Sequence, residues 1–207
     1  LPFFAKYTHK CELTIVKHGF YPKGNGELIL EIIPKYKVEQ IKKIPPLEYT
    51  KQGKVEMIQG YSIASLDLKK AYVAKRQTTQ IKKIFADYIT KIKTKYVNTD
   101  SSGSSLTLWT KTDKTIIGVD ELGQKGISSE TIASNAAKKL KEELNAHAAI
   151  DHHLADNLIP LMALIPGSRI TTSKITEHTK TNIWICEQLL PIDFKIEGNK
   201  ITSYKRE

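Results

Sequence analysis

The stretch HGFYPKGNGE, residues 18–27, lies between two segments that both have the composition of β-strands. CELTIVKHG overlaps its start and GELILEIIP follows it, and both are rich in β-branched residues. Pro22 fixes the backbone at the start of the loop, and Gly24 and Gly26 are expected to take positive φ angles. A phosphate-binding loop leads from a strand into a helix, whereas a second strand follows here. The stretch therefore predicts a hairpin turn rather than a phosphate cradle.

The composition is that of an ordinary globular protein. The chain has 207 residues, of which 40% are hydrophobic and 26% charged, enough for one large domain or two small ones. No stretch approaches the roughly 18 apolar residues of a membrane span, and LPFFAKYTHK lacks the plan of a signal peptide. We therefore expect a cytoplasmic protein with no membrane partner. Cys11 and Cys186 are too few for a disulfide framework and are expected to be reduced packing residues.

The positive charge is concentrated in one third of the chain. Residues 35–95 hold 15 Lys and Arg against 5 Asp and Glu, an excess of 10 that equals the net charge of +10 of the whole sequence. Clustered positive charge suits a polyphosphate partner, because each neutralised phosphate releases counterions. Lysines that only solvate a surface, in a composition set by genome bias or heat adaptation, explain the same excess equally well.

The sequence after the hairpin predicts both helices and strands. Residues 35–54 indicate a strand, a break at the Pro45-Pro46 pair and a surface turn near Gly53. Residues 67–92 predict an amphipathic helix with apolar positions Val73, Ile81, Ile84, Phe85, Tyr88 and Ile92. Two strands are expected around residues 106–108 and 116–119. A second helix in residues 128–147 has a Ser cap and the apolar positions Ile132, Ala136, Leu140 and Leu144.

The last third of the chain predicts a third helix in residues 150–167. Asp151 is its expected cap, and Pro160 inside it predicts a kink or a broken turn. The remaining segments are a strand, a short helix and a closing hairpin, in residues 168–176, 178–190 and 192–205. This order indicates an α/β (α+β) fold without the strict βαβ alternation of a doubly wound sheet.

Two histidine settings have ordinary explanations. Asp151, His152 and His153 are similar to the metal-binding trio of the Asp-His-His phosphoesterases, but the sequence lacks the upstream aspartate motifs that those sites need. Solvent-facing histidines at a helix N-terminus explain the trio better. His18 stands at a strand end before Gly19 and is expected to be structural or on the surface.

His178, in ITEHTKTNIW, is the candidate for chemistry. It stands at the end of a predicted strand, just before a helix that Thr179 or Thr181 can cap. A helix N-terminus disfavours an imidazolium, so the ring is expected to be neutral near pH 7, with a nitrogen able to attack. The same helix end attracts the phosphate that is attacked. The position suits a phosphate-directed nucleophile, and an ordinary histidine beside a helix cap is the alternative.

Three segments together resemble the RNA 3′-terminal phosphate cyclase family, namely HGFYPKGNGEL, HLADNLIPLMAL, and EHTKTN followed by ICEQLLP. They agree with the family in order and spacing, and the resemblance covers the whole chain. The family loop usually has three consecutive Gly, and Asn25 replaces the middle one. Asn tolerates a left-handed backbone, so the turn is expected to survive. The resemblance implies a core of βαβαββ-type repeats with a small inserted α/β domain.

The resemblance also implies roles for single residues. His178 would be the nucleophile that becomes adenylylated, with Thr181 and Asn182 in register. The nucleotide-contacting segment of the family maps to His153, Leu154, Ala155, Asp156 and Asn157. Asn157 replaces a Gln and keeps the amide with a shorter reach, and Asp156 would position the nucleotide or a metal ion. Pro2 resembles a proline near the nucleotide pocket, and Lys180 is assigned to phosphate charge from its position.

The resemblance divides the chain into two domains. Residues 1–54 and 148–207 would form the last repeat of a discontinuous core, and residues 55–147 an insert domain. The family's N-terminal repeats carry Glu, Arg and Gln residues around the nucleotide and the RNA phosphate, and nothing similar is visible here. The sequence thus resembles the C-terminal portion of such a protein.

The resemblance implies three chemical steps. His178 attacks the α-phosphorus of ATP, with Mg²⁺ or Mn²⁺ screening the triphosphate, and pyrophosphate leaves. The 3′-phosphate of RNA takes the AMP, and the adjacent 2′-hydroxyl then closes a 2′,3′-cyclic phosphate and expels AMP. ATP and RNA with a 3′-phosphate end are the implied partners, and a homodimer is compatible with the resemblance.

Two alternative interpretations stay open. Some relatives of the cyclases are non-catalytic ribosome-assembly proteins that lack the catalytic histidine, so the presence of His178 favours the enzyme. The chain is also compatible with an RNA-binding module that is inert without the N-terminal repeats. Such a module would bind RNA and would never be labelled by ATP.

Overall fold

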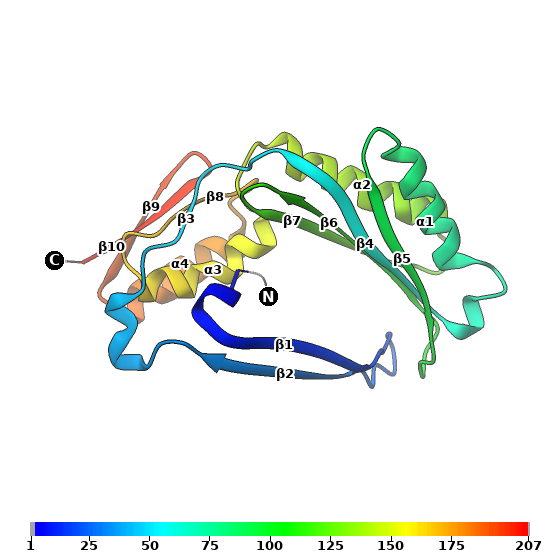
Figure 1. Cartoon of the computed structure of the whole chain (residues 1–207), viewed down its shortest axis with the longest axis horizontal. Helices are drawn as coiled ribbons and strands as arrows, with labels where there is room; N and C mark the ends of the chain where they lie inside the picture. The colour runs from blue at the N-terminus through cyan, green and yellow to red at the C-terminus, as the bar shows by residue number, and fades with distance from the viewer. Residues whose placement is uncertain (1–2, 207) are drawn as a thin grey trace.

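The computed structural model describes residues 3–206, whose ten strands form three sheets (Figure 1). The first sheet is the antiparallel pair β1 and β2, Thr8–Lys17 and Glu27–Pro34. The second has the order β3-β8-β10-β9 and comprises Glu48–Tyr49, Arg169–Thr171, Lys200–Lys205 and Ile192–Glu197. The third has the order β5-β4-β6-β7 and comprises Thr90–Val97, Val55–Ser65, Ser104–Thr112 and Ile116–Leu122. The α-helices are α1 Val73–Ile84, α2 Ser129–Asn145, α3 His152–Leu164 and α4 Glu177–Leu189.

The fold is α/β, as the sequence predicts. Parallel and antiparallel pairs occur in the same sheets, because β4 pairs in parallel with β5 and antiparallel with β6. In the second sheet β8 pairs in parallel with β3 and antiparallel with β10. None of the helices within residues 3–206 has the length and apolar character needed to cross a membrane.

The opening stretch forms the predicted turn between β1 and β2. Gly24 and Asn25 have φ angles of 67° and 55°, so both adopt the left-handed conformation. Asn25 keeps the turn, as expected, and its side-chain amide donates to Asp100 Oδ2 at 2.7 Å. The prediction of a positive φ at Gly26 is wrong. A Cβ atom there would lie 3.3 Å from the backbone nitrogen of Gly19, so Gly26 instead permits a close approach of two backbone segments.

Residues 35–54 do not form the predicted strand. Val38–Lys43 is a 3-10 helix, and extended pairing is limited to the two residues of β3. The backbone N–H of Lys37 donates to Gln40 Oε1 at 3.0 Å, a local bond that competes with strand pairing. Gly53 has a φ of 81°, which agrees with the predicted turn. The long strand β4 follows, in a segment where the sequence predicts no strand.

The helix predicted over residues 67–92 is shorter than expected. α1 ends at Ile84, Tyr88 follows it in a turn, and Ile92 lies on β5. Ile92 packs against the same core as Ile84, while the lysines on either side of it in sequence are exposed. Apolar residues among lysines fit the period of two of a strand as well as helical spacing over so short a segment. The two later strands and the helix with a Ser cap are confirmed as β6, β7 and α2.

Two hydrophobic cores lie at opposite ends of the molecule (Figure 1). The first surrounds α3 and includes Leu47, Ile150, Leu158, Ile159, Met162, Ile170 and Ile201. The second lies between the β5-β4-β6-β7 sheet and helices α1 and α2, and includes Ile58, Ile81, Leu106, Leu108, Ile117 and Leu140. The boundaries 1–54 with 148–207 and 55–147 would place a separate core in each of the two domains, and this division stays a prediction.

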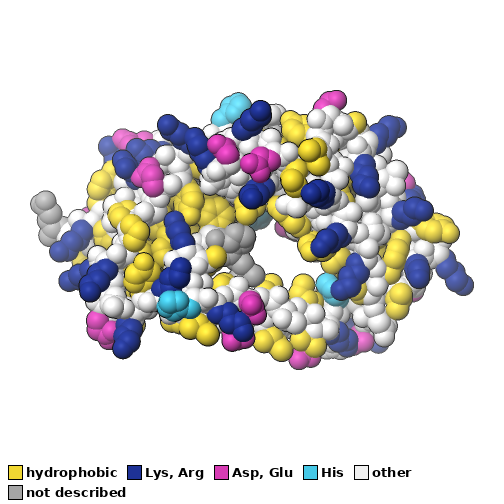
Figure 2. Space-filling view, viewed as in Figure 1, with side chains coloured by type: hydrophobic (Ala, Val, Ile, Leu, Met, Phe, Trp, Pro, Cys, Tyr) yellow, Lys and Arg dark blue, Asp and Glu magenta, His cyan; other side chains and the backbone are white. Residues whose placement is uncertain are grey.

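The β1–β2 hairpin reaches from the first core to the second. At its tip Asp100, in the loop after β5, accepts hydrogen bonds from Lys17 Nζ at 3.1 Å and from Asn25. Ser101 Oγ accepts from the backbone N–H of Lys23 at 3.1 Å. Figure 2 shows an opening between the hairpin and the rest of the molecule. Apolar side chains along the hairpin are exposed, among them Leu13, Ile15, Leu28, Leu30 and Ile32.

Candidate active site

His178 lies in the first turn of α4, and its side chain is exposed. The helix is capped by Thr176, so the expectation that Thr179 or Thr181 caps it is wrong. Thr176 Oγ1 accepts from the backbone N–H of Thr179 at 2.9 Å, and Thr179 Oγ1 accepts from that of Thr176 at 3.2 Å. This is a capping box with Thr in the place of Glu or Gln. The imidazole therefore lies at the positive end of the helix dipole.

Asp156 on α3 holds the start of α4 in place. Its Oδ1 accepts hydrogen bonds from the hydroxyls of Thr176, at 2.8 Å, and of Thr179. Each hydroxyl thus donates to the carboxylate and accepts from a backbone N–H. Thr179 is fully buried and Thr176 half-buried, so these bonds are sheltered from water. A carboxylate from the expected nucleotide segment therefore fixes the turn that carries His178.

A second bond between the helices compensates for Pro160. Proline has no N–H, so the carbonyl oxygen of Asp156, four residues earlier, lacks its normal partner within α3. Asn182 Nδ2 donates to this oxygen at 2.9 Å. α3 runs through Pro160 without interruption, from His152 to Leu164, so the predicted broken turn is absent from these residues. Asn182 thus joins α4 to α3 one helical turn after His178.

The other residues of the expected nucleotide segment divide between two faces of α3. His153, Asp156 and Asn157 are three and four residues apart and share one face. His153 and Asn157 are exposed, and Asn157 Nδ2 donates to the carbonyl oxygen of His153 at 2.7 Å. Leu154 packs against the first core and Ala155 is buried within it, so both serve the packing of α3. Pro2 lies outside the described residues.

Asp151 and His152 of the Asp151-His152-His153 trio have structural roles, of which the sequence indicated only the cap by Asp151. Asp151 caps α3 by accepting from the N–H of Leu154 at 2.8 Å, and it accepts from the N–H of Gly118 on β7 at 3.1 Å. His152 is half-buried rather than solvent-facing, with Nδ1 2.5 Å from Glu143 Oε1 on α2. Within residues 3–206 no group of three or more His, Cys, Asp or Glu side chains is placed to hold a metal ion. Asp151 and His152 thus join α3 to β7 and α2, whereas His153 is exposed.

Lys180 is paired with a neighbour on the exposed side of α4. Its Nζ lies 2.7 Å from Glu177 Oε1, and this hydrogen bond lowers the pKa of the Glu177 carboxyl below its usual value. The two residues lie on either side of His178 in sequence. Lys180 can therefore meet a phosphate only in competition with Glu177.

Comparisons with known proteins show which proteins this chain is similar to. A sequence model described as RNA 3′-terminal phosphate cyclase matches residues 1–196. The protein of that name from Methanosarcina barkeri is 36% identical over 190 residues, which cover 89% of this chain and 52% of the relative. Those from Pyrococcus abyssi and Korarchaeum cryptofilum are 36% and 30% identical, covering 90% and 91% of this chain and 52% and 53% of the relatives. The chain thus spans about half the length of the curated relatives it matches.

Proposed function

The chain belongs to the RNA 3′-terminal phosphate cyclase family, and on this basis we propose that it supplies the nucleophile for ATP-dependent cyclisation of RNA 3′-phosphate ends. The product would be a 2′,3′-cyclic phosphate. The observation that carries the proposal is the exposed imidazole of His178 in a helical turn held by Asp156. The family match covers both of these residues.

In the first step a ring nitrogen of His178 attacks the α-phosphorus of ATP. The N–P bond forms, the bond from that phosphorus to the bridging oxygen breaks, and pyrophosphate leaves. The exposure of the ring gives ATP access, and the positive end of α4 favours an approaching phosphate. The bonds from Asp156 to Thr176 and Thr179 keep the turn rigid, so the ring is presented from a fixed element.

The next two steps transfer the nucleotide to RNA and close the ring. An oxygen of the RNA 3′-phosphate attacks the phosphorus of the histidine-bound AMP, and the imidazole leaves. The neighbouring ribose 2′-hydroxyl then attacks the terminal phosphorus, loses its proton and expels AMP. The hydroxyl is held beside its target by the ribose itself, so this step gains from a high effective molarity.

The shared face of α3 is the proposed nucleotide contact. His153, Asp156 and Asn157 lie on this face, and Asp156 connects it directly to the turn of His178. The described residues do not fit a protein-held site for Mg²⁺ or Mn²⁺, because they offer no group of three ligands. No step is assigned to a metal ion.

Labelling with α-³²P-ATP, added together with Mg²⁺ or Mn²⁺, tests the proposal. We expect an acid-labile and alkali-stable label on the protein after denaturing electrophoresis, as a phosphoramidate requires. His178→Ala should abolish it, and His9→Ala, which removes an exposed histidine on β1, should keep it. The assay is run with this chain alone and together with the segment of the Methanosarcina barkeri relative that the chain does not match. No label in either sample would contradict the proposal and favour the RNA-binding interpretation.

A further inference from the structure

The β5-β4-β6-β7 sheet has one face covered by helices and one face open. Ile58, Leu106 and Leu108 point toward α1 and α2 and are fully buried. The residues that alternate with them point to the other side, which Figure 1 shows turned toward the β1–β2 hairpin. We call this side the open face, and its residues used below are Tyr61, Lys91, Lys93, Lys95, Trp109 and Lys111.

Two aromatic rings form the centre of the open face. Tyr61 on β4 and Trp109 on β6 have ring centroids 5.5 Å apart and planes inclined by 32°. Trp109 Nε1 donates to Gln59 Oε1 at 3.1 Å, so the indole is held in one orientation. Tyr61 is 39% exposed, so part of its ring is accessible from outside. The sheet thus presents a fixed aromatic surface to the outside.

Lysines line the edge of this aromatic surface. The register pairs Tyr61 with Lys93. Lys91 and Lys95 lie on the same side of β5, each two residues, or about 6.6 Å along the strand, from Lys93. Lys93 Nζ lies 5.6 Å from the Tyr61 ring centroid. Lys111 adds a fourth amino group from β6. None of these four lysines takes part in the ion pairs found among residues 3–206, so their charge is not neutralised there.

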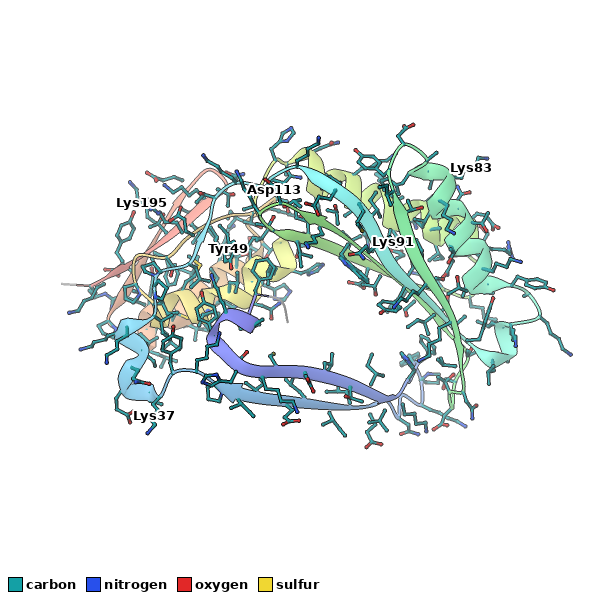
Figure 3. All side chains as sticks on the ribbon, in the orientation of Figure 1. Lys37, Tyr49, Lys83, Lys91, Asp113 and Lys195 are labelled. Atoms are coloured by element: carbon teal, nitrogen blue, oxygen red, sulfur yellow. The ribbon has the colours of Figure 1, made fainter. Side chains whose placement is uncertain are left out.

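The structure leaves space in front of this face. Figure 2 shows the opening beside the hairpin, with basic side chains (Lys or Arg) at its rim. Figure 3 places Lys91 on the sheet and Lys83 on α1, on the side of the sheet away from the hairpin. The contacts of Asp100 with Lys17 and Asn25 close the opening at the hairpin tip. The open face is reached from the side of this opening, because the helices cover the opposite face of the sheet.

We propose that the open face binds single-stranded RNA, with bases stacked on Tyr61 and Trp109 and phosphates held by Lys91, Lys93, Lys95 and Lys111. Aromatic side chains on a sheet stack unpaired bases of any sequence, and flanking lysines neutralise the backbone. Asp120 on β7 is the acidic residue beside them on this face, and the lysines outweigh its charge. The choice of RNA as the occupant rests on the proposed function, and this face would hold nucleotides that precede the reacting 3′ end.

Fluorescence anisotropy with a labelled oligouridylate of about 12 nucleotides, bearing a 3′-phosphate, tests the proposal. We expect Tyr61→Ala to raise the Kd about tenfold, whereas Tyr61→Phe, which keeps the ring, should leave it within about twofold. Lys93→Ala should weaken binding and reduce the slope of log Kd against log salt by about 0.7. Lys83→Ala is the matched control, because it removes an exposed lysine from α1 and should change neither quantity.

Tryptophan fluorescence gives a second measurement that does not depend on a binding-site substitution. The chain has two tryptophans, and Trp184→Phe leaves Trp109 as the only one. We expect the oligonucleotide to quench Trp109 and a duplex RNA of equal length to quench it less, because its bases are already stacked. Absence of quenching would overturn the proposal. The proposal would also be overturned if Tyr61→Ala and Lys93→Ala bound the RNA as tightly as the control Lys83→Ala. The open face would then be a candidate site for a protein partner.

The two proposals can fail separately. Labelling of His178 by ATP needs no RNA, so Tyr61→Ala and Lys93→Ala should be labelled like the unsubstituted chain. Loss of RNA affinity in these variants without any label at His178 would support the RNA-binding face and contradict the proposed reaction. A label at His178 with RNA affinity that is insensitive to Tyr61 and Lys93 would support the reaction and contradict the RNA-binding face.

Discussion

The side-chain amide of Asn182 donates to the main-chain carbonyl oxygen of Asp156 over 2.9 Å. This carbonyl lacks a partner within α3 because residue 160 is a proline. The side-chain carboxylate of the same Asp156 accepts from Thr176 and Thr179. Asp156 is thus bound to α4 through both its main chain and its side chain. Its partners include Thr176, which precedes His178 in sequence, and Asn182, which follows it. The orientation of the candidate nucleophile depends on this pair of helices.

The bond from Asn182 predicts a specific energetic coupling with Pro160. Asn182→Ala leaves the carbonyl of Asp156 without a donor and should lower the free energy of unfolding by about 1 kcal/mol. Pro160→Ala supplies the missing N–H within α3. In that background Asn182→Ala should cost close to nothing. Urea unfolding of the four proteins of this double-mutant cycle measures the coupling, and strictly additive effects would contradict the assignment.

We expect two substitutions of Asp156 to lower the free energy of unfolding by different amounts. Asp156→Ala leaves the hydroxyls of Thr176 and Thr179 without an acceptor and should cost about 2 kcal/mol of unfolding free energy. Asp156→Asn keeps one acceptor oxygen and should cost about half as much. Thermal and urea unfolding check the order. A destabilisation by Asn as large as that by Ala would show that charge, rather than an acceptor at this position, holds α4.

We expect His18, near the hairpin tip, to make the stability of the chain depend on pH. Burial and then the charge of Lys95 lower the pKa of His18 below its ordinary value of 6.5. Between the pKa of His18 in the folded chain and its higher pKa in the unfolded chain, the unfolded chain binds more protons. The free energy of unfolding should therefore fall as the pH decreases from about 6.5 through the lower pKa of the folded chain. NMR titration should show the pKa of His18 rising in Lys95→Ala. Lys91→Ala, at the other end of β5, should leave it unchanged; an equal rise in both variants would contradict the role of Lys95.

The carboxylate of Asp100 contributes to the docking of the hairpin tip, beside the bond from Lys23 to Ser101. Asp100 accepts from Lys17 and Asn25, and all three side chains are at least partly exposed, so Asp100→Ala should change the global free energy of unfolding little. The effect should instead be local. Hydrogen exchange at residues 18–27 should become faster, while exchange in α3 stays the same. Unchanged exchange at the tip would show that other contacts hold the hairpin.

The sequence predicted those features that depend on neighbouring residues. The turn at Asn25, the Asp151 cap, the spacing of Leu140 in α2 and the closing hairpin at Gly198 all follow from local propensities, and the structure confirms them. His178 was expected at the end of a strand, just before a helix; it lies in the first turn of α4, and the preceding strand β8 already ends at Thr171. Its role there stays a prediction.

The features that the sequence missed arise from contacts between distant segments. The bond from Asn182 to Asp156 exists because α4 packs on α3, so the effect of Pro160 on α3 could not be read from the proline alone. The bond between His152 and Glu143 joins α3 to α2 in the same way. The sequence did not predict β5. Its lysines alternate with other residues along the strand, and over a short segment this pattern resembles the polar side of a helix.

The most direct test of the account is to locate the nucleotide by tandem mass spectrometry after incubation with ATP. The two samples are this chain alone and this chain with the unmatched segment of the Methanosarcina barkeri relative. We expect one added AMP on the peptide that contains His178, with fragment ions placing it on that imidazole. AMP on His153, on a lysine or on no residue in either sample would contradict the assignment of His178 as the nucleophile.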